Sequence, residues 1–109
     1  MAISHAGSGE IVDLRPLGSR LPDERTTAIV KSDAFEAIRL VVPAGRRIAP
    51  HEVSGKITLH CLEGRILLEL PDAELEMSAG EWIHLDGGVR HALSGIEDAS
   101  LLLTILFDR

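Results

Sequence analysis

The residues best suited to do chemistry in this chain are histidines that stand in two regularly spaced motifs. The first motif reads G-x5-H-x-V-x3-I-x6-G and the second reads G-x5-D-x-G-x2-H. The residues that define the motifs are Gly45, His51, Val53, Ile57, Gly64, Gly80, Asp86, Gly88 and His91. Imidazole nitrogens bind divalent metals and also make hydrogen bonds to small molecules. His51 and His91 are therefore the first candidates for a binding site.

The two motifs resemble the consecutive motifs of the cupin family, whose members fold as a small antiparallel β-barrel. The family pattern is G-x5-H-x-H-x3-E-x6-G followed by G-x5-P-x-G-x2-H, and this chain keeps every interval. In the family, two His and the Glu of the first motif hold a divalent metal together with the His of the second. Here Val53 stands at the second His position and Ile57 at the Glu position. The resemblance covers about residues 35–107 and implies an all-β, cupin-like double-stranded β-helix, or jelly-roll, barrel.

Metal binding by this set of residues stays open. Zinc sites usually take three or four protein ligands, and non-haem iron typically takes two His and a carboxylate. An Ile at position 57 also removes the anion that would offset the metal's charge in a pocket of low dielectric. The alternatives are a weakly held divalent ion (Zn, Ni, Mn or Fe), a metal-free pocket with two histidines, and two histidines that are simply hydrogen-bonded. Further residues could complete a metal shell if the strand faces differ from expectation: Glu52, His60, Cys61, Glu63 and His84.

Two classes of function follow from these alternatives. The first is a non-catalytic or sensory protein that binds a small molecule in an apolar cavity marked by the histidines. The cavity residues would be His51, Val53, Ile57, Cys61 and His91. The second is a metal-dependent enzyme, for which the resemblance implies dioxygenases, isomerases and decarboxylases that act on small acids or carbonyl compounds. The fold alone cannot choose between these classes, because function depends on the residues of the site. The missing Glu argues against the enzyme, and the retained histidine pair argues for it.

Short apolar runs and frequent turn signals predict the strands that must carry these residues. The predicted strands span residues 26–31, 35–42, 48–53, 57–63, 65–70, 73–77, 81–85, 89–94 and 100–107, with 10–14 as a further candidate. Roughly nine or ten short strands favour a closed or nearly closed barrel, which leaves few exposed edges. Residues 15–24 carry Pro16 and Pro22 and cannot form a central strand. We expect residues 1–9 to be a frayed leader and residues 10–109 to form one domain.

The alternation of strand residues predicts which side chains meet inside the barrel. If Ile57 faces inward, residues 59, 61 and 63 share its face, and His60 points away from the pocket. By the same alternation, His51 shares a face with Val53. We expect His84 outside, because Ile83 and Leu85 are the better core residues of that strand.

Residues 101–107 are apolar on both faces apart from Thr104. A strand covered on both faces needs a layer outside the barrel as well as the barrel interior. A second copy of the chain would supply that layer, and small single-domain cupins, which the chain resembles, are often homodimers. The alternative cover is the segment of residues 10–14.

Composition restricts the partners and the compartment. The chain has 109 residues and a formal net charge of -6, which disfavours nucleic acid and anionic membranes as partners. No apolar run approaches the roughly 18 residues needed to span a bilayer. Cys61 is the single cysteine, which suits a reducing compartment, so we expect a cytoplasmic protein. With nucleic acid and membranes disfavoured, the expected partner is a small-molecule ligand.

Overall fold

The computed structural model describes residues 5–51 and 53–107, and for Pro50 and His51 it describes the backbone only. Glu52 and residues 1–4 of the expected leader therefore lie outside the described residues. The elements are η1 (Gly18–Asp23), β1 (Thr27–Lys31), β2 (Phe35–Val42), β3 (Arg47–His51), β4 (Ile57–Glu63), β5 (Arg65–Leu70), β6 (Ala73–Ser78), β7 (Trp82–Leu85), β8 (His91–Gly95) and β9 (Ala99–Leu106).

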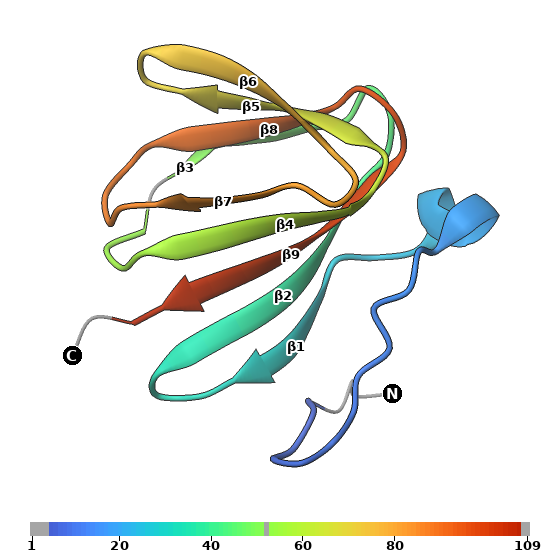
Figure 1. Cartoon of the computed structure of the whole chain (residues 1–109), viewed down its shortest axis with the longest axis vertical. Coiled ribbons are helices and arrows are strands. Elements are labelled where there is room, and N and C mark those ends of the chain that lie inside the picture. Colours follow the sequence, from blue (N-terminus) through green and yellow to red (C-terminus); the bar gives the residue numbers. More distant parts are fainter. Residues whose placement is uncertain (1–4, 52, 108–109) are drawn as a thin grey trace.

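The strands form two antiparallel sheets (Figure 1). The five-stranded sheet has the order β1-β2-β9-β4-β7, and the four-stranded sheet has the order β3-β8-β5-β6. In each sheet a late strand is inserted between earlier ones, β9 between β2 and β4 and β8 between β3 and β5. This crossing pattern is that of a jelly roll, and it confirms the predicted all-β class.

The predicted strands agree closely with the observed ones. The bounds of β2, β4 and β5 are those expected, and the bounds of the other six strands differ by one or two residues at one or both ends. The prediction of a strand over residues 10–14 was wrong. That stretch makes no ladder, and Ile11 is 96% exposed. The backbone amide of Arg15 donates instead to the side chain of Asp13, a local contact that competes with a ladder.

A single apolar core lies between the two sheets. The inward side chains of β4 face this core as alternation predicts, with Ile57, Leu59 and Cys61 all at most 2% exposed. Their partners in the ladder are the inward residues of β9, among them Leu101 and Leu103. The four-stranded sheet contributes buried residues to the same cluster, namely Ile66, Leu68, Met77 and Leu93.

The end of β4 departs from strict alternation. The register of β4 against β9 shifts between Cys61 and Glu63, which is a β-bulge, so Glu63 pairs with Ser100. An extra residue in one strand moves the following side chain to the other face. The expectation that Glu63 shares the inward face of Ile57 was therefore wrong. Gly64 follows the bulge with φ of 76°, and a Cβ there would lie 2.0 Å from the carbonyl oxygen of Asp98, so this turn requires glycine.

Leu68 and Leu75 stand opposite each other in the β5–β6 ladder, yet Leu68 is 0% exposed and Leu75 is 39% exposed. We expect Leu68→Ala to lower the free energy of unfolding by about 2–5 kcal/mol, because it leaves a cavity in the core. Leu75→Ala should cost less than half as much. Urea unfolding followed by circular dichroism measures both, and equal losses would contradict the described packing.

Candidate functional site

The two motif histidines stand on neighbouring strands. In the ladder of β3 and β8, His51 is the direct partner of His91. Residues directly opposite each other in an antiparallel pair share a face of the sheet, with Cβ atoms about 4.5–5.5 Å apart. His91 precedes the core residue Leu93 by two positions, so its position faces the barrel interior, and it is 3% exposed. The fold therefore brings the two predicted positions together.

The ring of His91 is oriented by a backbone contact. Its Nδ1 lies 2.9 Å from the carbonyl oxygen of Val89. A carbonyl oxygen only accepts hydrogen bonds, so Nδ1 carries the proton and, in the neutral ring, Nε2 carries the lone pair. Histidines that bind metals or accept hydrogen bonds from ligands are commonly held in this way.

The other expected cavity residues belong to the packed core. Ile57 and Cys61 are buried in the core cluster, and Val53 packs against it. Burial raises the pKa of the Cys61 thiol above its usual value, and the nearby charges of Glu81 and Glu63 add to the rise. A raised pKa disfavours the thiolate, which is the form that binds metals. A cavity bounded by these three residues and the histidine pair stays a prediction.

His60 and His84 lie on the outer side of the five-stranded sheet, as expected. In the β4–β7 ladder, Thr58 pairs with His84 and His60 pairs with Trp82. Because both histidines are out of phase with the inward residues of their strands, neither faces the same side as His91. Among the side chains that the structure describes, no group of three or more His, Cys, Asp or Glu is arranged to hold a metal ion.

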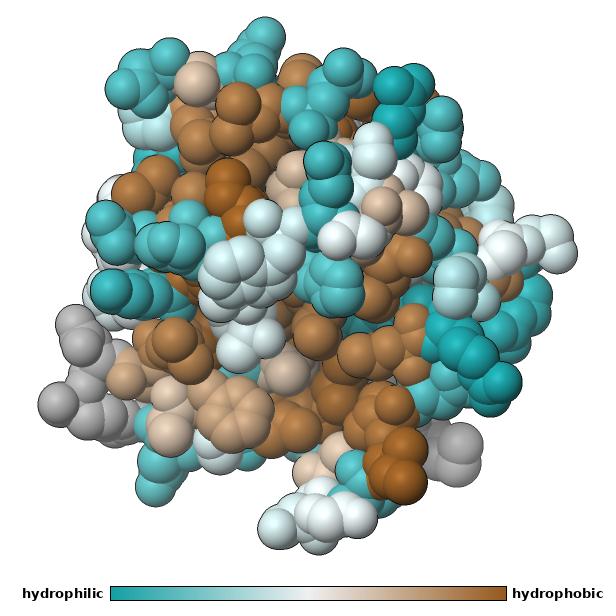
Figure 2. Space-filling model, in the orientation of Figure 1, coloured by the Kyte–Doolittle hydropathy of each residue, from teal (hydrophilic) through white to brown (hydrophobic). Residues whose placement is uncertain are grey.

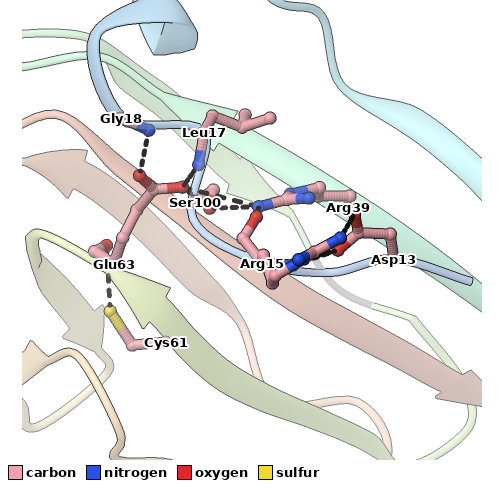
Figure 3. Close-up of polar contacts among 8 residues, drawn as sticks. All are labelled: Asp13, Arg15, Leu17, Gly18, Arg39, Cys61, Glu63 and Ser100. Carbon is pink, nitrogen blue, oxygen red and sulfur yellow. Dashed lines mark hydrogen bonds and ion pairs between the residues drawn. The ribbon is translucent and has the colours of Figure 1, made fainter.

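Glu63 takes part in a polar cluster outside the barrel (Figure 3). Its carboxylate accepts hydrogen bonds from the backbone amides of Leu17 and Gly18, at 2.9 and 3.1 Å, and from the hydroxyl of Ser100. Arg39 Nη2 lies 3.5 Å from the same carboxylate. Glu63 is thus engaged on the far side of the sheet from His91, and the suggestion that it completes a metal shell there was wrong.

Arg39 ties the same cluster to the N-terminal segment, defined here as residues 5–25. Its Nη2 donates to the carbonyl oxygen of Arg15 at 2.7 Å and to Ser100 at 3.3 Å. Arg39 is only 9% exposed, and its Nε has no hydrogen-bond partner among the residues that the structure describes. Sequence reasoning missed this cluster, although a polar residue inside each of two apolar strands, Arg39 in β2 and Ser100 in β9, was the available signal.

The cluster shifts the ionisation of Glu63. Burial raises the pKa of this carboxyl, but the hydrogen bonds from Leu17, Ser100 and Gly18 and the charge of Arg39 outweigh burial, so the pKa lies below its ordinary value of 4.5. A carboxylate with a lowered folded pKa stabilises the fold above its unfolded pKa. That contribution is lost as the pH falls through the folded pKa.

We expect Glu63→Gln to lower the free energy of unfolding at about pH 7, by roughly 1.5–3 kcal/mol, because charge-assisted hydrogen bonds are lost. The wild-type protein should become less stable as the pH falls below about 4.5, because Glu63 is then protonated. In Glu63→Gln this fall in stability should be smaller, because the glutamine does not titrate. Urea unfolding at several pH values measures both effects, and the matched control is Glu74→Gln at an exposed position of β6. Wild type and Glu63→Gln with the same pH dependence would contradict this role.

Comparison with solved structures finds proteins of one fold. A cupin superfamily protein from Desulfitobacterium hafniense aligns with a TM-score of 0.76 at 18% identity, covering 90% of this chain and 95% of that chain. A Streptococcus pyogenes protein of unknown function aligns with a TM-score of 0.76 at 18% identity, covering 100% and 99%. An RmlC-like cupin protein from Desulfovibrio desulfuricans aligns with a TM-score of 0.73 at 20% identity, covering 89% and 97%.

These alignments confirm the resemblance to small cupin domains at the level of the fold. No protein-family model matches the chain, and no curated protein matches it either. Within residues 5–51 and 53–107, no helix is long and apolar enough to cross a membrane.

Proposed function

We propose that this cupin-fold chain is a non-catalytic or sensory protein that binds a small molecule, or a weakly held divalent ion, at the pair His51 and His91. The observation that carries the proposal is the direct pairing of the two histidines across β3 and β8. The contact of His91 Nδ1 with Val89 supports it, because it leaves the lone pair on Nε2.

The donor set fits a tightly held catalytic metal poorly. Val53 and Ile57 offer hydrocarbon where the family pattern has a His and a Glu. His60 and His84 belong to the outer side of the other sheet, and Glu63 is engaged there. Two neutral imidazoles fall short of the three or four ligands of usual zinc sites. A metal-dependent enzyme, the alternative function, would need at least one further ligand, so we derive no catalytic step through a metal.

We expect the unmodified chain to bind Zn²⁺, Ni²⁺ or Mn²⁺ weakly, with affinity that falls as the imidazoles protonate near their reference pKa of about 6.5. The double variant Val53→His, Ile57→Glu should bind much more tightly, because it restores the four ligands of the family pattern. It should also lose about 1–3 kcal/mol of stability without metal, since a buried carboxylate lacks a partner.

Calorimetric titration measures these affinities. His91→Ala should abolish the weak binding, and His84→Ala, which removes an outer histidine, should not change it. Tight binding by the unmodified chain would contradict the small ligand set, and binding that survives His91→Ala would contradict the site.

We also propose that two copies associate through the outer side of the five-stranded sheet. Strand alternation gives this side uncharged residues on three adjacent strands: Thr58, His60, Trp82, His84, Leu102, Thr104 and Leu106. Trp82 is 58% exposed and Leu106 is 44% exposed. Figure 2 shows brown and pale side chains over the middle of the molecule, with many of the hydrophilic ones towards its margins.

Charge and coverage favour a second copy as the occupant of this surface. Two molecules with net charge -6 repel each other, and an uncharged side permits their closest approach. The N-terminal segment does not replace the partner, because it contacts Arg39 of β2 through Arg15 and leaves Trp82 exposed. Large aromatic residues such as Trp82 are frequent anchors of interfaces.

Light scattering should show a dimer of the 11.8 kDa chain at micromolar concentration, because an obligate interface buries about 2,000 Å² or more. Trp82→Glu should shift the population to monomer, since each interface would then bury two carboxylates. Ile96→Glu adds the same charge at a position in the turn between β8 and β9 and should leave the dimer intact. A stable wild-type monomer would contradict this interface.

The cytoplasm is the compartment we propose. The single cysteine, Cys61, is buried in the core and has no disulfide partner within the chain. Such a chain gains nothing from an oxidising environment.

A further inference from the structure

A small cavity lies beside His91 and carries an unbalanced positive charge. It has a volume of about 220 Å³ and is lined by residues of β3, β5, β8 and their connections, including Arg47, Glu69, Leu70, Pro71, Arg90 and His91. These segments lie together because β8 runs between β3 and β5 (Figure 1). By strand alternation, Arg47, Glu69 and Ala92 are out of phase with the inward residues of their strands. The cavity therefore opens on the outer side of the four-stranded sheet, and His91 borders it.

The two other charged residues of this cavity neutralise each other. Arg47 Nε lies 3.1 Å from one carboxylate oxygen of Glu69, and Arg47 Nη2 lies 3.2 Å from the other. Such a two-point pair holds both groups in fixed positions and cancels their charges. Glu69 therefore opposes an anionic ligand much less than a lone carboxylate would.

Arg90 is the charge that remains. It is exposed, and within the described part of the chain its guanidinium makes no hydrogen bond or ion pair. It directly precedes His91, which is 3% exposed. A chain of net charge -6 thus presents an exposed guanidinium without a partner among the described residues at this outer cavity.

We propose that this cavity binds a small organic acid, with Arg90 as the residue that anchors the carboxylate. This inference goes beyond the proposed function, because the cavity opens on the other side of the sheet from the inward histidine pair. A guanidinium matches a carboxylate with two parallel hydrogen bonds. Leu70 and Pro71 offer a wall for a short hydrocarbon chain. The volume equals about seven waters at roughly 30 Å³ each, which suits an acid of a few carbons.

A monocarboxylate fits this cavity better than inorganic phosphate. Phosphate sites usually combine several backbone amides at a helix N-terminus with positive side chains. Here one free guanidinium and an apolar wall face the cavity. Both a carboxylate and a phosphate present an oxyanion to Arg90, and separate titrations with each of them can tell the two ligands apart.

Titration of ¹⁵N-labelled full-length protein with sodium butyrate tests the inference. We expect saturable amide shifts at Arg90, His91 and Ala92, with weaker shifts for butyramide and for inorganic phosphate. Arg90→Gln should weaken butyrate binding about tenfold or more, whereas Arg20→Gln, which removes the same charge on η1, should not. The Arg90-dependent affinity should also fall as salt is added.

The outcomes separate this inference from the proposed function. Absence of saturable butyrate shifts, equal binding by wild type and Arg90→Gln, or equal binding of butyramide would overturn the role of Arg90. Metal binding that depends on His91 would still support the histidine pair in that case. Conversely, butyrate binding that depends on Arg90 while metal binding ignores His91→Ala would support the acid site and overturn the metal site.

Discussion

The packing of two sheets against one apolar core is the constraint on which the rest of this structure depends. Strand side chains alternate, so a slip of one residue would send every inward side chain of a strand to the outer side. Leu101, Leu68 and Leu93 are each at most 1% exposed, which fixes the registers of β9, β5 and β8. The pairing of His51 with His91 follows from that register, because β3 is aligned on β8. The candidate site is thus positioned by hydrocarbon contacts elsewhere on the same strands.

The bulge at the end of β4 shows how a local irregularity creates a new contact. It turns Glu63 to the outer side, where Arg39, Ser100 and two backbone amides of the N-terminal segment meet it. Burying an ion pair costs desolvation that the attraction between the charges often only balances. Its clearer effect is on specificity, because the amides at Leu17 and Gly18 are satisfied only when the segment takes this one path. The cluster therefore fixes where residues 15–18 cross the outer side of the sheet.

Much of the fold was predictable from sequence, and the reasons are local. Gly64 and Pro71 flank β5, so turn residues mark its ends, and the alternation in β4 was enough to place His60 outside. The position of Glu63 was not predictable, because no residue type marks a bulge in advance. The cluster of Arg39 with Arg15 was also beyond reach, since it joins positions 24 residues apart through a backbone carbonyl. Residues 10–14 look like a strand in isolation, but Asp13 accepts a hydrogen bond from the backbone amide of Arg15, a local turn contact that competes with a ladder.

The charges around the histidine pair bear on what the site prefers to bind. A divalent cation in a site of low dielectric needs an anion nearby, and Ile57 occupies the position where the family pattern supplies one. On the outer side of the same sheet, Arg47 and Glu69 cancel each other, and Arg90 adds a positive charge to the cavity there. A neutral imidazole can hydrogen-bond an oxyanion or bind a metal, so the histidines alone do not decide between the two. The missing anion argues against a tightly held divalent cation at the histidine pair, and the charge of Arg90 is the reason for proposing an organic acid in the outer cavity.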